Sequence, residues 1–267
     1  MEHSRSIVRR SWYGLVKLAV ATGIAYFLVG RLGLALRAEP GVAVFWPASG
    51  IAIGALIALG PGARLPVAAG VTVATAACNL MIGRHPWLAI ALGLLNALQP
   101  LITMWLLERW FGGTFKLEDV QRVLGFFAAT AIASAGTALA AAIAISLVEP
   151  TTFPVHVWRL WFAACSLGII TVAPLLVGLG DVLREGLPRR ELIEGCAGLI
   201  MVTALSALLI SLPDGPWATA LPESLVVPFL LWIAMRCRPV FAAAAALIVG
   251  LMGNRIDNPQ SWTLRLR

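Results

Sequence analysis

The segment VLGFFAATAIASAGTALAAAIAISLV, residues 123–148, contains no charged side chain over 26 positions. A helix rises about 1.5 Å per residue, so this segment is long enough to cross the ~30 Å hydrocarbon core of a bilayer. Similar stretches recur along the chain between short polar connections. The nine predicted spans cover residues 15–36, 42–59, 65–83, 87–107, 123–148, 157–179, 196–212, 221–235 and 239–253. The sequence therefore predicts an all-α, polytopic transmembrane bundle of about nine helices.

The composition supports a membrane protein. Of the 267 residues, 60% are hydrophobic and only 12% are charged, which leaves too little polar surface to coat a water-soluble protein of this length. A net charge of +7 would suggest a nucleic-acid partner for a soluble protein. Here the basic residues lie in short loops that face anionic headgroups, so we expect the lipid bilayer as partner and no nucleic acid.

The basic residues also predict an orientation. With a cytoplasmic N-terminus, thirteen of them fall on the inner side: Arg5, Arg9, Arg10, Lys17, Arg64, Arg109, Lys116, Arg122, Arg184, Arg189, Arg190, Arg236 and Arg238. Four fall outside, namely Arg31, Arg37, Arg84 and Arg159, and the last three follow the ninth span, where they break the rule. This excess predicts a multi-pass protein of a bacterial inner (plasma) membrane with its N-terminus inside.

The chain is predicted to form one membrane domain. Residues 1–14 are predicted as a basic cytoplasmic segment, residues 15–253 as the integral-membrane domain, and residues 254–267 as a short polar tail that we expect to be truncated or non-native. The connections at 108–122 and 181–194 are predicted as solvated cytoplasmic loops. The scattered Cys and His residues, and the lack of a long soluble stretch, predict no catalytic residues, no cofactor and no metal site.

The last two spans are short. At about 15 residues each they reach only ~22 Å, less than the ~30 Å core, so we expect a tilted pair or a re-entrant hairpin that turns at residues 236–239.

The strongest local motif is FWPASG, residues 45–50. Pro47 cannot donate a backbone hydrogen bond, and Ser49 and Gly50 can accommodate the carbonyls that this leaves free. The motif predicts a kinked or broken entry to the second helix. An interfacial Trp followed by a Pro near a helix start would produce the same sequence without any role in binding, and this alternative stays open.

A polar face runs along the fourth span. Asn96, Gln99 and Thr103 recur at i, i+3 and i+7, so they share one helical face that should point into the bundle. Pro100 removes a backbone donor beside them and frees a carbonyl one turn earlier. Hydrogen bonding between helices would explain the polar face as well as a pocket would.

Depth in the membrane brings several polar residues to one level. Arg31, Trp46 and Asn79 lie within roughly 8 Å of the outer ends of their helices, with Ser49 and Asn96 at most about two turns deeper. We therefore predict a pocket open to the outer leaflet, although Arg31 could instead snorkel to the interface or pair with Glu39. The candidate ligand-pocket residues are Arg31, Trp46, Pro47, Ser49, Asn79, Asn96 and Gln99.

Five segments in this order resemble the MASE type 1 family, the membrane-associated sensor domains of bacteria. They are the WPASG opening at 46–50, the small-residue helix that ends at Asn79, the Asn96 helix that runs into LLER at 106–109, the segment 161–176 with LG at 167–168 and APLL at 173–176, and LWIAMR at 231–236. The resemblance covers about residues 26–253. It implies a membrane input module that is fused to histidine kinase, diguanylate cyclase or phosphodiesterase outputs, often through PAS domains.

Three departures from the family pattern bear on mechanism. Family members often have an acid where this chain has Gln99 and an Asp where it has Cys165, so a proton-linked or cation-linked mechanism through those acids is in doubt here. The family pattern also implies one further helix and an output domain after residue 253. The resemblance thus implies a sensory input domain of two-component or cyclic-di-GMP signalling, without its output.

The partners follow from this interpretation. We expect a small molecule or a membrane protein as the signal, and a second copy of the chain in a homodimer. The alternative is a small-molecule transporter or a transporter-like accessory protein, because broken helices with polar groups in the membrane also suit alternating access.

The orientation can be tested by cysteine labelling in a background that lacks the four native cysteines. Lys116→Cys and Arg189→Cys should resist a membrane-impermeant maleimide in intact cells, because both positions belong to the basic inner side. Arg84→Cys, on the predicted outer side, is the positive control. Labelling of either inner position from the periplasm would overturn the predicted orientation.

Overall fold

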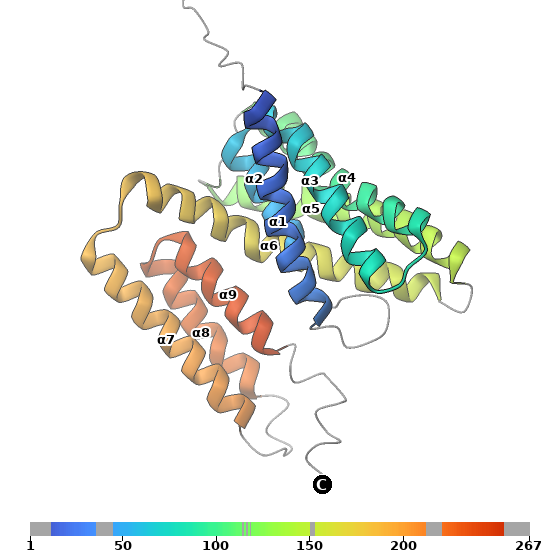
Figure 1. Cartoon of the computed structure of the whole chain (residues 1–267). Coiled ribbons are helices and arrows are strands. Elements are labelled where there is room, and N and C mark those ends of the chain that lie inside the picture. The colour runs from blue at the N-terminus through green and yellow to red at the C-terminus, as the bar shows by residue number, and fades with distance from the viewer. Residues whose placement is uncertain are drawn as a thin grey trace, which may run out of the picture.

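The computed structural model describes residues 12–35, 45–113, 115, 117, 119–149, 153–211 and 221–253. This part of the chain forms nine α-helices and no strand, which confirms the all-α prediction (Figure 1). The helices are α1 (Trp12–Ala35), α2 (Ala48–Leu59), α3 (Arg64–Met81), α4 (Pro86–Phe111), α5 (Val120–Val148), α6 (Pro154–Glu185), α7 (Arg189–Ser211), α8 (Leu221–Arg236) and α9 (Pro239–Gly253). Residues 1–11 and the predicted tail at 254–267 lie outside the described residues.

Six of these helices are long and apolar enough to cross a membrane: α1, α3 with the short 3₁₀ helix η1 (Pro61–Ala63) before it, α4, α5, α6 and α7. The other three, α2, α8 and α9, are shorter apolar helices. The chain turns between α8 and α9 at Cys237 and Arg238, where the hairpin was predicted.

The prediction of a full span at residues 42–59 is wrong in its described part. Phe45 and Trp46 are not helical, and α2 begins only at Ala48, after Pro47. With 12 residues it reaches about 18 Å, because the broken entry predicted at Pro47 shortens the helix.

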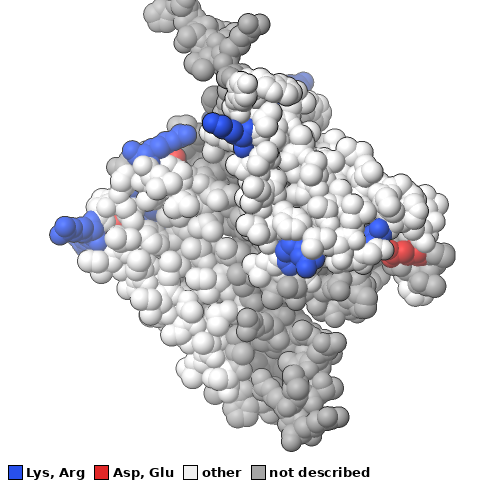
Figure 2. Space-filling view, in the orientation of Figure 1, with Lys and Arg blue, Asp and Glu red and all other residues white. Residues whose placement is uncertain are grey.

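The lipid-facing surface is apolar. On α1, an exposed row of large apolar side chains recurs every four residues: Trp12, Val16, Val20, Ile24, Leu28 and Leu32. A row with this spacing drifts by about 40° per step and so winds around roughly half of the helix, and a soluble protein would rarely leave such a surface uncovered. Figure 2 shows that charged residues on the visible face gather near helix ends and leave a broad uncharged surface between them.

Helix α6 joins two groups of helices. The helices α1 to α5 pack against one another, and α2 and α5 pack on α6. The helices α7, α8 and α9 form a second group that meets the first through the packing of α9 on α6. In Figure 1, α6 accordingly runs between the blue-green helices and the orange-red ones.

Glycines allow α2 and α6 to approach at backbone distance. A Cβ on Gly168 of α6 would lie 2.0 Å from the carbonyl oxygen of Trp46, and a Cβ on Gly50 of α2 would lie 2.4 Å from the carbonyl oxygen of Gly168. Small residues have this role in membrane bundles, where close packing takes the place of a hydrophobic driving force between helices.

The polar connections are shorter than predicted. Helix α4 continues to Phe111, and α6 and α7 leave only residues 186–188 between them, so the predicted solvated loop at 181–194 is mostly helical. Ion pairs occupy these helix ends: Arg64–Glu108, Arg122–Asp119, Arg190–Glu194, Arg236–Glu194 and Arg238–Glu191. Cys237, between α8 and α9, lies near Glu194 and Arg236, and burial raises the pKa of its thiol.

The contact between α2 and α6 predicts unequal effects of two glycine substitutions. Gly168→Ala should lower the free energy of unfolding in detergent by about 1–3 kcal/mol, because the new methyl group would overlap backbone that cannot yield easily. Gly136→Ala is the matched control, since a Cβ there meets no atom within 4 Å, and it should stabilise helix α5 by up to about 1 kcal/mol. Equal unfolding energies for the two variants would contradict the proposed contact.

Candidate functional site

Gln99 lies at the centre of a buried polar cluster. Its side chain is fully buried, its Oε1 accepts a hydrogen bond from Ser49 Oγ at 3.2 Å, and its Nε2 donates one to Ser134 Oγ at 2.7 Å. These bonds join α4 to α2 on one side and to α5 on the other. An amide in an apolar interior is costly unless both of its ends are paired, so Gln99 constrains how the three helices pack.

Trp46 extends the cluster to α1 and α6. Its indole Nε1 donates a hydrogen bond to the Tyr26 hydroxyl at 2.9 Å, and the two rings meet edge to face with centroids 6.4 Å apart. The Trp46 backbone N donates to the carbonyl oxygen of Ala164 at 3.2 Å. The non-helical residue before α2 is thus held from two sides.

Two further side chains complete the cluster. The Cys165 thiol lies beside Ser49 and Gln99. The Thr75 hydroxyl lies beside that of Tyr26, outside hydrogen-bond geometry. Each of the first six helices now contributes one member, and we call the following set the polar cluster: Tyr26, Trp46, Ser49, Thr75, Gln99, Ser134 and Cys165.

The polar face predicted on the fourth span is buried, which confirms that it points into the bundle. A second polar row, with spacing i, i+4 and i+7, is buried on the neighbouring α5. The two rows are Asn96, Gln99 and Thr103 on α4, and Thr130, Ser134 and Thr137 on α5. Two atoms in these rows, Asn96 Oδ1 and Thr130 Oγ1, are buried without a hydrogen-bond partner. These rows therefore keep unused hydrogen-bonding capacity inside the protein.

The structure brings together part of the predicted pocket. Trp46, Pro47, Ser49 and Gln99 meet in or beside the polar cluster, and Asn96 is buried one turn from Gln99. Pro47 stands at the N-cap of α2, where Ser49 N donates to the Trp46 carbonyl at 3.2 Å and Gly50 N donates to the Pro47 carbonyl at 3.0 Å.

The other two predicted residues lie apart from these contacts. The Arg31 side chain is exposed, and Asn79 is half-buried with its Nδ2 donating to the Thr75 carbonyl of its own helix at 2.8 Å. A single cavity that includes both of them stays a prediction.

Four members of the cluster were not among the predicted pocket residues: Tyr26, Thr75, Ser134 and Cys165, of which the family resemblance had marked Cys165 alone. For Ser134 a signal existed, because Thr130, Ser134 and Thr137 repeat the helical spacing that singled out the face on α4. For Tyr26 the signal was weaker, because Thr22, four residues earlier, is the one polar residue at helical spacing from it on α1.

The chemistry of the cluster is hydrogen bonding between neutral groups. Hydroxyls, an amide, an indole and a thiol meet there without an acid or a charged base. Among the described residues, no three His, Cys, Asp or Glu side chains lie close enough together to hold a metal ion. The fold and this site define a polytopic membrane domain whose first six helices meet at a neutral polar core.

The comparison with known families identifies this domain. The MASE1 family model matches residues 15–252, and the chain belongs to the MASE1 family. MASE1 domains are membrane sensory input domains and are not catalytic. The resemblance seen in the sequence is therefore confirmed. No curated protein and no solved structure matches the chain.

The role of Gln99 in stability can be measured directly. Gln99→Leu should lower the free energy of unfolding in mixed micelles by about 1–3 kcal/mol, because the hydroxyls of Ser49 and Ser134 would lose their buried partner. A double-mutant cycle with Ser134→Ala should give a coupling energy between about 0.6 and 1.7 kcal/mol. Thr203→Ala is the control, because that hydroxyl is exposed and bonds its own helix. Zero coupling would mean that the bond between Gln99 and Ser134 contributes nothing to stability.

Proposed function

We propose that this chain is the sensory input domain of a bacterial inner-membrane signalling protein, and that it regulates a histidine kinase or diguanylate cyclase output. Membership of the MASE1 family supports the sensory role. The kind of output, the homodimer and a signal that is a small molecule or a membrane protein are inferred from the family resemblance described above. The N-terminus faces the cytoplasm in this proposal, on the strength of the basic residues.

The observation that carries the proposed mechanism is the double contact of α6. Near its middle, Cys165 belongs to the polar cluster and Gly168 packs against the backbone of Trp46. Ten residues further on, about 15 Å along the helix, Gly178 packs so tightly on α9 that a Cβ would lie 2.9 Å from that of Val240. A rearrangement of the cluster that displaces α6 therefore reaches the second group of helices.

The polar rows offer a second packing that a signal could stabilise. The unpartnered oxygens of Asn96 and Thr130 cost free energy in the packing seen here, so an arrangement or a ligand that pairs them gains that energy back. Pro100 in α4 leaves the Asn96 carbonyl without its helical donor, and Pro174 in α6 does the same for Ile170. Both helices thus contain a position at which the backbone can adjust.

The test is to place this chain in a full-length relative, in place of that relative's MASE1 domain. Asn96→Leu should abolish the response of the kinase or cyclase to its signal and leave membrane insertion intact, because it removes a buried amide and adds no polarity. Thr203→Leu, at an exposed position of α7, should leave the response unchanged. If the Asn96→Leu variant responds normally and loses only a little stability, Asn96 has a structural role and does not take part in sensing.

Two further measurements separate the sensor from the transporter. Deletion of the membrane domain from an intact relative should abolish regulation of its output. Substrate-dependent flux through this chain in proteoliposomes would instead support the transporter.

A further inference from the structure

A cavity lies away from the polar cluster, at the junction of the two helix groups. It has a volume of about 730 Å³ and opens between the end of α2, the start of α5, the second half of α6 and the start of α9. This volume lies within the ~300–1,000 Å³ range of sites for small ligands. The described residues that line it come from both helix groups, so an occupant would touch both.

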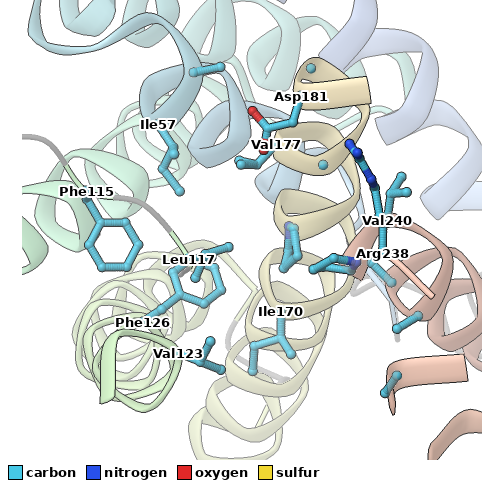
Figure 3. Close-up of a pocket in the computed structure, with 18 of the residues that line it drawn as sticks. Ile57, Phe115, Leu117, Val123, Phe126, Ile170, Val177, Asp181, Arg238 and Val240 are labelled. Carbon is cyan, nitrogen blue, oxygen red and sulfur yellow. The ribbon is translucent and has the colours of Figure 1, made fainter. Parts of the chain in front are cut away.

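The cavity is amphipathic along its length. Among its described lining residues, the charged ones are Asp181 and Arg184 near the end of α6 and Arg238 before α9. The rest of the wall is apolar and includes Phe126 and Ile170. Figure 3 shows Asp181 beside Val177 and Arg238 beside Val240, with the aromatic rings of Phe115 and Phe126 on the other side of the view.

The depth of the cavity corresponds to one membrane leaflet. Asp181 and Ile170 both line it and are 11 residues apart on α6, which is about 16 Å along the helix axis. One leaflet supplies about half of the ~30 Å hydrocarbon core. The charged end lies where α6 finishes, and the apolar wall extends from there toward the middle of the membrane.

Among the described residues that line the cavity, two arginines and one aspartate stand at its mouth, so the lining there is basic on balance. Arg238 Nε donates to Glu191 Oε2 at 2.9 Å, which holds the guanidinium at the rim. Arg184 is exposed, and no ion pair joins it to another described residue. Other arginines at this corner are paired with acids: Arg190 and Arg236 both lie within ion-pair distance of Glu194, and Figure 2 shows basic and acidic side chains together around the connection of α6 to α7. A ligand with a negative head and an apolar tail complements this site.

We propose that this cavity binds an anionic phospholipid from the adjacent leaflet. Arg184 and Arg238 contact the phosphate, and one acyl chain lies along Val177 and Ile170 between α5 and α9. The lipid then fills the junction through which α6 connects the polar cluster to α7, α8 and α9. This proposal does not depend on the signalling output proposed above.

The test uses the purified full chain and native mass spectrometry with dioleoyl phosphatidylglycerol and dioleoyl phosphatidylcholine. The chain should retain phosphatidylglycerol preferentially. Arg184→Gln should weaken phosphatidylglycerol binding about fivefold and leave phosphatidylcholine binding unchanged, because one basic side chain near the headgroup is lost. Arg190→Gln is the matched control, since Arg190 pairs with Glu194 and does not line the cavity. Equal losses in the two arginine variants would overturn the proposal, because they would indicate attraction to surface charge alone.

A second pair of variants tests the position of the acyl chain. Val177→Phe narrows the cavity and should reduce the binding of both lipids at least threefold, whereas Val155→Phe, at an exposed position of the same helix, should not. Circular dichroism and monodisperse elution establish that each variant is folded. Unchanged binding in folded Val177→Phe would exclude the cavity as the site. Displacement of the lipid by soluble glycerol phosphate would also refute the proposal, because it would point to a site for free phosphate.

Discussion

The structure depends on one requirement, that the amide of Gln99 be paired on both sides in an interior from which water is absent. An unpaired amide in such an interior costs several times the net gain of a hydrogen bond, so the packing that gives Gln99 both partners is strongly favoured. Those partners, Ser49 and Ser134, stand on α2 and α5. The register of three helices is therefore set by a single side chain, and Trp46 links that arrangement to α1 and α6.

Backbone proximity gives this arrangement its second constraint. Gly50 and Gly168 let α2 approach α6 until backbone atoms touch, which places Ser49 beside Cys165. The broken entry at Pro47 also brings helices together. Because α2 starts only at Ala48, the non-helical Trp46 can reach both Tyr26 and Ala164. The polar cluster and the contact between α2 and α6 are thus one structural unit, and α6 extends from it to the second group of helices.

Much of the fold could be predicted, and the errors have physical reasons. Hydropathy located the helices because each membrane span needs an uninterrupted apolar segment. Such a segment can be recognised from consecutive residues alone. Hydropathy overestimated the span at 42–59, since apolar composition cannot distinguish a helix from non-helical residues such as Phe45 and Trp46 before Pro47. It also placed a loop at 181–194. In the structure α6 continues past Asp181 to Glu185, and α7 begins at Arg189, where the ion pair Arg190–Glu194 supports a helix beyond the apolar segment.

The sequence by itself determined that the chain is helical and membrane-embedded, that it resembles the MASE1 family, and that the Asn96 and Gln99 face points inward. These properties depend on composition and on spacing along one helix. Only the tertiary structure decided that Gln99 meets Ser49 and Ser134, that Tyr26 and Cys165 join them, and that Arg31 and Asn79 stand apart from these contacts. Partners on different helices depend on the rotation and approach of each helix, and contacts between distant segments contribute to these, such as that of Gly50 with Gly168, 118 residues further along the chain.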